Sequence, residues 1–352
     1  MSTRPTLSDV ARLAGVHQAT ASRALNPRTS GRVSPVTARR VRAAAEELGF
    51  TPNTAARSLR MNRSFTVGVL MPDLINPLFP PMARGIEAAL APRGYTALLA
   101  NTDSDEDKER HQFDVLLGRQ VDGFIVATAR RKHPLLDEAR KSGVPIVLLN
   151  RCTDRKLFPF VAGDDSAGVS LAAEHLLERG HRHVAHVSGP QDMSTGITRA
   201  RAFRHAMESA GIGPDQAPVI PARAYTVAAG EQATGELLDR HPATTAIVAG
   251  NDLIALGALH VLRARGLRCP QDVSLVGFND MQFADEFQPP LTTVHVPHHE
   301  LGAEAAHLLL ELLDRSDLSY DTVWAAKTVL LPVHLVIRES TADAVDRKPT
   351  RG

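Results

Sequence analysis

Apolar residues recur at helical spacing near the start of the chain. The first stripe repeats every three or four positions and consists of Leu7, Val10, Ala11 and Ala14. Thr6, with Asp9 three residues later, is typical of a capped helix start. A turn at Gly15 leads into a second helix, which must end by Asn26-Pro27, because the residue before a proline is pushed out of helical geometry.

A third helix follows the same rules. Ser34 is positioned to cap it, Pro35 suits its first turn, and Gly49 ends it. Its buried stripe consists of Val41, Ala45 and Leu48. Three short helices joined in this way predict an all-α helix-turn-helix head, a module that reads DNA.

After Phe65 the pattern changes to short apolar runs that alternate with helical stretches. Strands are expected at 66–71, 95–100, 123–127, 145–149, 184–188, 246–249 and 273–277. Helices are expected at 82–93, 105–119, 135–142, 166–179, 197–210, 228–239 and 253–265. Strands that alternate with helices form parallel sheets with helices on both faces. About 275 residues exceed what one core usually holds, so this α/β region is expected to form two lobes.

Charge is distributed unevenly along the chain. Residues 1–63 contain eleven arginines and three acidic residues, a net charge of +8, whereas residues 64–352 carry −7. A basic module attached to an acidic body indicates nucleic-acid binding. The alternative is a helical bundle whose arginines only keep it soluble, which would make the agreement between helix pattern and charge a coincidence.

The segment from Thr6 to Asn26 resembles the head of the LacI/GalR (lactose-repressor) family of transcription regulators, and the resemblance continues almost to the end of the chain. The family pattern is T-L-x-D-V-A-x-x-A-G-V-S-x-x-T-V-S-R-V-L-N, and His17 replaces its serine, which caps the recognition helix. The resemblance places three residues at base edges in the major groove: Gln18, Ala19 and Arg23. It implies phosphate contacts for four short polar residues: Thr6, Thr20, Ser22 and Asn26.

Residues 50–64 link the head to the α/β region. Pro52 suits the first turn of a helix of about two turns, which is marginal in isolation. In the family this segment is the hinge helix, which orders on operator DNA and inserts a leucine into the minor groove, and Leu59 matches that leucine. Asn53 and Ala56 are assigned to the same element. The alternative is an inert linker that happens to contain a leucine.

The resemblance also implies the architecture of the α/β region, that of periplasmic sugar-binding proteins with two similar lobes. The head is assigned to 1–49, the linker to 50–64 and the two lobes to 65–340. The lobes are expected to comprise an N-lobe of about 65–162 and 293–323 and a C-lobe of about 163–291 and 325–340, with crossings near 162, 292 and 324. The polar tail 341–352 is expected to be disordered, and it holds no leucine heptads for a coiled coil.

Parallel sheets bind ligands outside the carboxyl ends of their strands, so residues there are candidates for an effector pocket between the lobes. This rule selects Asp73, Asn76, Phe79, Asn150, Arg151, Asn251, Asn279 and Asp280. The resemblance adds Arg199, which matches the family arginine that reaches the effector, and Tyr225, which matches an aromatic position. Such a set suits a small polar effector, a sugar or sugar derivative. Asn251 and Asp280 have the alternative role of capping a helix or turn, and Asn279 stands where many family members carry aspartate.

Several classes of protein find no support in the sequence. It contains no phosphate-binding loop, no nucleophile elbow and no histidine set with metal-ligand spacing, so we expect neither an enzyme nor a metal or cofactor site. Cys152 and Cys269 are too few for a disulfide framework. Without a signal peptide or an apolar run long enough to span a membrane, the protein is expected to be cytoplasmic.

Together these features predict a homodimeric transcription regulator, a repressor whose affinity for a pseudo-palindromic operator in double-stranded DNA is controlled by the effector. One alternative is a corepressor-dependent or global regulator that responds to a nucleobase or to a phosphorylated protein partner. Another is a solute-binding protein without DNA activity, which the basic head and the missing signal peptide disfavour.

Overall fold

The computed structural model describes residues 5–25, 29–50, 63–314 and 327–344. Contacts divide the chain into two compact units, Met1–Ser64 and Phe65–Gly352. Each unit is built around its own apolar core.

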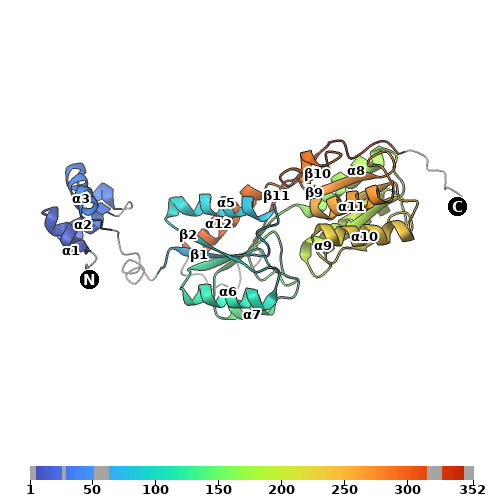
Figure 1. Cartoon of the computed structure of the whole chain (residues 1–352). Helices are drawn as coiled ribbons and strands as arrows, with labels where there is room; N and C mark the ends of the chain where they lie inside the picture. The colour runs from blue at the N-terminus through green and yellow to red at the C-terminus, as the bar shows by residue number, and fades with distance from the viewer. Residues whose placement is uncertain (1–4, 26–28, 51–62, 315–326, 345–352) are drawn as a thin grey trace. The chain divides into compact units, whose positions relative to one another are not determined.

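The described residues of the first unit form three α-helices (Figure 1): α1 (Leu7–Leu13), α2 (Gln18–Leu25) and α3 (Pro35–Glu47), with the short 3-10 helix η1 (Ser30–Arg32) between the last two. Thr6 and Asp9 form the predicted capping box, and the Ser34 side chain accepts the N–H of Thr37. Small apolar side chains make up the core: Val10, Ala11, Ala14, Ala21, Ala24, Ala38, Val41, Ala44 and Ala45. Small side chains let the three helices approach closely, and the predicted helix-turn-helix fold is confirmed.

The first lobe of the second unit is a six-stranded parallel sheet with the order β11-β5-β4-β3-β1-β2. Its strands are β1 (Thr66–Met71), β2 (Thr96–Asn101), β3 (Gly123–Val126), β4 (Ile146–Leu149), β5 (Phe160–Gly163) and β11 (Thr328–Leu331). Its helices are α5 (Phe79–Leu90), the short η2 (Ala91–Arg93), α6 (Glu106–Gly118), α7 (Pro134–Lys141) and α12 (His298–Asp314). Helices α5 and α12 cover one face of the sheet, and α6 and α7 cover the other (Figure 1).

Helices α5 and α12 pack backbone against backbone. A Cβ atom added to Gly302 would lie 2.0 Å from the carbonyl oxygen of Met82, and one added to Gly85 would lie 1.9 Å from that of His299. Only glycine permits this approach, so the two helices form a rigid layer over the sheet.

The second lobe has a sheet of the order β12-β10-β9-β8-β6-β7, in which only β12 runs antiparallel. Its strands are β6 (Val184–Ser188), β7 (Val219–Pro221), β8 (Ala246–Ala249), β9 (Ser274–Asn279), β10 (Thr292–His295) and β12 (His334–Val336). Its helices are α8 (Asp165–Glu178), α9 (Ser194–Ser209), α10 (Val227–Arg240), α11 (Asp252–Ala264) and the short η3 (Ala284–Glu286). The apolar clusters place α8 and α9 on one face of this sheet and α10 and α11 on the other.

The chain passes between the two sheets three times, and two of these crossings lie further along the chain than predicted. The first falls between β5 and α8, close to the expected residue 162. The second follows β10, not residue 292, because β10 pairs with β9 before the chain leaves the second sheet. The third lies between β11 and β12, beyond residue 324, because β11 pairs with β5 of the first sheet. The partner of a four-residue strand is set by pairing across the sheet, which composition does not reveal.

The predicted disordered tail 341–352 is wrong for its first four residues. The Thr341 hydroxyl lies 2.9 Å from Nε2 of His175, the Ala342 N–H donates to Ser274 Oγ at 3.1 Å, and the Ala344 N–H donates to a backbone carbonyl. These polar groups are ordered because each is paired with the second lobe. Residues 345–352 lie outside the described part of the chain. No helix within the described ranges has the length and apolarity needed to span a bilayer.

Candidate functional site

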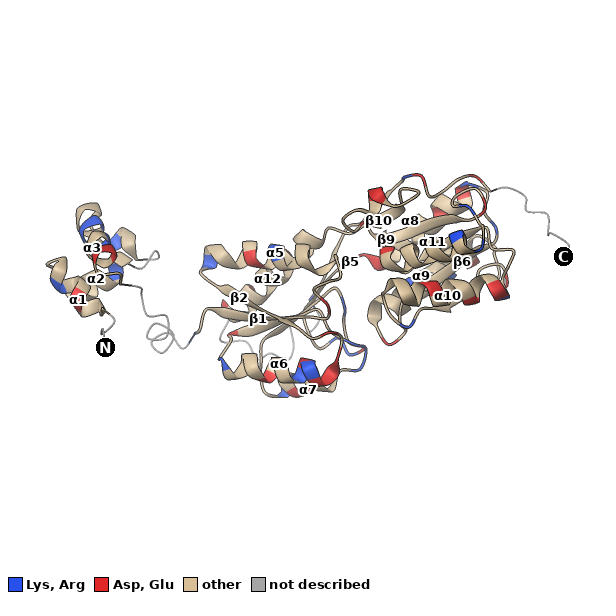
Figure 2. Cartoon of the chain, viewed as in Figure 1, with Lys and Arg blue, Asp and Glu red and all other residues tan. Residues whose placement is uncertain are grey.

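Helix α2 presents a polar surface on the head. Ala21 and Ala24 are buried against α1 and α3, whereas Gln18, Ala19 and Arg23 are exposed. The ribbon of these helices carries several basic positions and few acidic ones (Figure 2). An exposed amide and guanidinium on a short helix match the donors and acceptors of base edges in the major groove.

His17 caps this helix in place of the expected serine. Its ring Nδ1 accepts the backbone N–H of Ala19 at 3.2 Å, and its carbonyl oxygen accepts the N–H groups of Thr20 and Ala21. The cap is therefore present despite the departure from the family pattern.

The predicted phosphate-contacting residues differ in their exposure and in their hydrogen bonds within the head. Thr20 and Ser22 are half-buried on α2. The Thr6 hydroxyl donates to Asp9 Oδ2 at 2.6 Å, and this bond helps to lower the pKa of Asp9. Four further predicted residues lie outside the described part of the chain: Asn26, Asn53, Ala56 and Leu59.

A cleft of about 270 Å³, including the part open to solvent, lies between the two lobes of the second unit. The cleft residues are Asn76, Leu78, Asn150 and Arg151 from the first lobe and Thr195, Arg199, Tyr225, Asn251 and Asn279 from the second. Seven of the ten predicted effector-binding residues are among them. The lobes touch beside the cleft, where the Cys152 N–H donates to Ser194 Oγ at 2.9 Å.

Arg199 is held by groups of its own lobe. Its Nε and Nη2 bind one carboxylate oxygen of Asp165 at 2.9 and 2.7 Å, and its Nη1 donates to the Gly250 carbonyl oxygen at 2.6 Å. Its guanidinium also stacks 3.6 Å from the centre of the Phe278 ring. Burial raises the pKa of Asp165, and the charge of Arg199 opposes that shift. Asp165 is the first residue of α8 and also the counter-ion of this arginine, a role that the sequence did not reveal.

Arg151 has a different environment. The residue is 6% exposed, and its Nε has no hydrogen-bond partner among the described residues. Its guanidinium carbon lies 5.8 Å from the centre of the Tyr225 ring. Burial lowers the pKa of Arg151, and the like charges of Arg199 and Arg130 add to this shift, whereas Tyr225 and Asp192 oppose it.

Tyr225 and Thr195 form one wall of the cleft. The Tyr225 hydroxyl donates to Thr195 Oγ1 at 2.9 Å, and burial raises the pKa of Tyr225. Sequence reasoning did not select Thr195. Its position four residues before Arg199, on the same face of α9, was the available signal.

Three asparagines lie at or just after the ends of strands: Asn150, Asn251 and Asn279. Asn150 and Asn279 have positive φ values of 66° and 112°, which turn the chain sharply after β4 and at the end of β9. Asn251 caps α11, since its Oδ1 accepts the Ile254 N–H at 2.8 Å. Its capping role is thus confirmed, and its side chain also lines the cleft.

The structure does not bring Asp73, Phe79 or Asp280 to the cleft. Phe79 is 1% exposed and belongs to the apolar core, because the first turn of α5 faces the sheet. Asp73 accepts the N–H of Ile75 in its own loop at 2.9 Å. Proximity to a strand end in sequence did not settle where these side chains lie.

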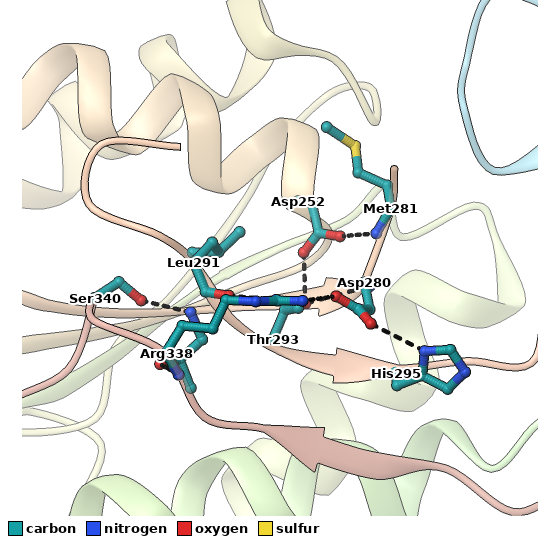
Figure 3. A network of polar contacts seen from close by, with 9 residues as sticks. Asp252, Asp280, Met281, Leu291, Thr293, His295, Arg338 and Ser340 are labelled. Atoms are coloured by element: carbon teal, nitrogen blue, oxygen red, sulfur yellow. Dashed lines mark hydrogen bonds and ion pairs between the residues drawn. The ribbon is translucent and has the colours of Figure 1, made fainter. Parts of the chain in front are cut away.

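Asp280 belongs to a polar network behind the cleft (Figure 3). It binds Nη2 of Arg338 at 2.7 Å and Nδ1 of His295 at 3.0 Å. The neighbouring Asp252 accepts the Thr293 hydroxyl at 2.6 Å and the Met281 N–H at 2.7 Å. Burial raises the pKa of Asp252 to about 7. The network ties the residues that follow Asn251 and Asn279 to the strand β10.

His181 and His186 make hydrogen bonds within the second lobe. His186 is fully buried and its Nδ1 contacts the Val248 carbonyl oxygen at 2.8 Å, and burial lowers its pKa to about 4. His181 contacts the hydroxyls of Thr245 and Ser274. Within the described ranges, no three His, Cys, Asp or Glu residues are grouped so as to hold a metal ion.

Two family models match the chain. Residues 64–326 match the periplasmic binding proteins and sugar binding domain of the LacI family, and residues 6–53 match the bacterial regulatory proteins of the lacI family. The HTH-type transcriptional regulator CelR of Thermobifida fusca is 37% identical over 96% of this chain and 98% of its own. The ribose operon repressor of Halalkalibacterium halodurans is 34% identical over 96% of this chain and 97% of its own.

Solved structures agree with these matches. The lac repressor dimer bound to operator and the anti-inducer ONPF superimposes with a TM-score of 0.81 at 27% identity, over 97% of this chain and all of that one. A complex of the transcriptional regulator CelR with cellobiose gives a TM-score of 0.70 at 34% identity, over 96% of this chain and all of that one.

Proposed function

Because this chain belongs to the LacI family of bacterial regulatory proteins, we propose that it is a sequence-specific transcription regulator, a repressor whose operator affinity is set by a polar effector in the cleft. The observation that carries this proposal is the exposed polar face of the capped helix α2, on a head of net charge +8. The exposed residues of this face do not pack against the other helices of the head, so they are available to bind DNA.

On DNA, α2 lies in the major groove. Gln18 pairs with adenine, Arg23 with guanine, and Ala19 contacts a thymine methyl group. Thr20 and Ser22 bind phosphates, which orient the helix without reading sequence. Thr6 and Asn26 add phosphate contacts, and the hinge residues Asn53, Ala56 and Leu59 enter the minor groove.

In the cleft, the amides and arginines bind a sugar or sugar derivative, and Tyr225 provides a platform for its apolar face. Similar proteins support this class of ligand, since a regulator of similar structure was solved with cellobiose and another with ribose. Residues from both lobes line the cleft, so a bound effector favours one arrangement of the lobes.

Two copies of the chain place their heads on the two halves of a pseudo-palindrome, about one helical turn apart. Effector binding and operator binding are then coupled reciprocally, by roughly 1–3 kcal/mol. A homodimer is consistent with the similarity to the lac repressor dimer on operator.

The DNA-binding half of the proposal is tested by selecting duplexes from a random library with the full-length chain at physiological salt. The R23Q variant should relax preference at one base pair of each half-site, by about 1–3 kcal/mol. The R42Q variant removes an equal charge from the exposed side of α3 and should weaken all duplexes alike. The proposal is rejected if the wild-type chain selects no palindrome over random duplex.

The effector half is tested by measuring operator affinity across a panel of sugars and nucleosides. R199A should abolish the response to any active compound, whereas R201Q, on an exposed position of α9, should leave it unchanged. An intact response in R199A would show that the effector binds elsewhere.

A further inference from the structure

We propose that the effector carries an anionic group, a phosphate or a carboxylate, which binds Arg151 at the first turn of helix α9. This inference rests on the proposed function, since it takes the cleft as the effector site. It narrows the ligand from polar sugars in general to sugar phosphates or sugar acids.

The main observation is a buried guanidinium that lacks a counter-ion. Arg151 is 6% exposed and lines the cleft, and its Nε has no partner among the described residues. No carboxylate of the described residues lies within ion-pair distance of it. An unpaired donor in a dry site is costly, and a charged one is more so, unless a ligand completes it.

Arg199 shows what a compensated arginine looks like in the same cleft. The Asp165 carboxylate neutralises it, and the Gly250 carbonyl oxygen accepts its Nη1 at 2.6 Å. The residues that line the cleft include these two arginines and no carboxylate. With Arg199 neutralised from behind, the cleft keeps one uncompensated positive charge, that of Arg151.

The groups around Arg151 act on it in both directions. Tyr225 and Asp192 stabilise its charged form, whereas Arg199 and Arg130 act on it as like charges, and none of the acidic groups is close enough to form an ion pair with it. The Asp192 main chain is engaged in a different contact, since its carbonyl oxygen accepts the Arg131 N–H at 3.0 Å. An anionic ligand group would satisfy Nε and balance the charge at once, whereas a sugar hydroxyl would satisfy only the donor.

An independent feature that favours an anion is the N-terminus of α9. This helix of 16 residues begins at Ser194, its N-cap residue Met193 makes no side-chain cap, and its first turn holds no acidic residue. Thr195, in that first turn, lines the cleft. The Cys152 N–H donates to Ser194 Oγ, which brings the residue after Arg151 against the same turn.

The other long helices of this lobe begin differently. Side chains cap α8, α10 and α11, and α8 and α11 carry an aspartate in the first turn. Among these four helices α9 alone lacks a side-chain cap, so a ligand group can cap its first turn, although Asp192 directly precedes its N-cap residue Met193. A guanidinium and an uncapped helix start on opposite lobes would hold an anion between them.

The first experiment uses inorganic phosphate as the probe and the full-length chain. We expect phosphate at 20 mM to raise Tm by about 2 °C over sodium chloride of the same ionic strength. R151Q should lose this difference, while R151K, which keeps the charge, and R201Q, an exposed arginine of α9, should keep most of it. Equal stabilisation by phosphate and chloride in the wild-type chain overturns the proposal, whether or not R151Q folds.

The second experiment compares matched ligands by calorimetry: glucose, glucose 6-phosphate and glucuronate, then ribose, ribose 5-phosphate and ribonate. We expect an acidic member to bind at least ten times more tightly than its neutral partner, and R151Q to remove most of that ratio. The phosphate and carboxylate arms distinguish the two sources of charge. If a neutral sugar binds as tightly as both of its acidic partners, the proposal of an anionic effector is wrong, but the cleft is still the effector site. If the chain selects no operator sequence, the proposed function is wrong instead.

Discussion

Replacing Asp165 by asparagine takes the charge from a buried ion pair while keeping the shape of the side chain. Its partner Arg199 is 4% exposed and would lose its counter-ion, keeping only neutral partners: the amide oxygen at position 165, the Gly250 carbonyl oxygen and the Phe278 ring. Removal of one partner from a buried pair typically costs 3–5 kcal/mol. Because the Asp165 side chain is 14% exposed and water reaches it in part, we expect D165N to cost about 3 kcal/mol.

The reciprocal change, R199M, leaves the Asp165 carboxylate buried without its counter-ion. Burial already raises the pKa of Asp165, and loss of Arg199 removes the influence that lowers it. In R199M the pKa of Asp165 in the folded state therefore lies above its value in the unfolded state. The folded chain then holds a proton at pH values at which the unfolded chain has lost it. The cost of R199M should therefore be largest near pH 8 and shrink as the pH falls towards 5.

The assay is a double-mutant cycle of urea unfolding, followed by circular dichroism on the full-length chain. The double variant D165N/R199M should cost no more than the larger single change, which gives a coupling energy of about 2–3 kcal/mol. If the two single costs simply add, the pair contributes nothing and the reasoning from burial is wrong.

Three further predictions concern stability. The pKa of Asp252 in the folded state, about 7, lies above its unfolded value, so the stability that it contributes is lost as the pH rises from about 4 to 7. The free energy of unfolding should fall by about 1.4 kcal/mol per pH unit in this range. Unfolding profiles measured across the range should lack this slope in D252N. G302A should lower the free energy of unfolding by about 2–4 kcal/mol, since its Cβ would meet the Met82 carbonyl oxygen, whereas G118A, with open space around it, should be neutral or stabilising. H17S should strengthen the cap of α2 by up to about 1 kcal/mol, seen as slower amide exchange in that helix, and unchanged exchange would show that the imidazole caps as well as a hydroxyl.

Local rules predicted the helical head well because its determinants are close in sequence. The capping box of Thr6 and Asp9, the cap at Ser34 and the turn glycines each act within a few residues. The same holds for the seven strands that were predicted from apolar runs, of which β3, β4 and β8 have only four residues. By contrast, five strands of three or four residues were not identified: β5, β7, β10, β11 and β12. The helix α12 was also missed, although Leu301, Ala305, Leu308 and Leu309 recur at helical spacing.

The cleft residues that lie at the ends of parallel strands could be predicted from the order of strands and helices. Asn150, Asn251 and Asn279 follow or end parallel strands, and this rule places them at one edge of their sheets. The partnership of Arg199 with Asp165 was not foreseen, since 34 residues separate them and the contact depends on how α8 packs against α9. The prediction that Phe79 lines the cleft was wrong for a related reason, because the rotation of α5 about its axis depends on how the whole core packs.

The polar network links the cleft to the chain crossings. Asp252 and Asp280 directly follow the cleft residues Asn251 and Asn279. Asp252 accepts the Thr293 hydroxyl on β10, and Asp280 binds Arg338, beyond β12. These two strands flank the second and third crossings between the lobes. We therefore expect a ligand that moves Asn251 or Asn279 to strain hydrogen bonds to segments next to two of the crossings between the lobes, which would couple effector binding to the arrangement of the lobes.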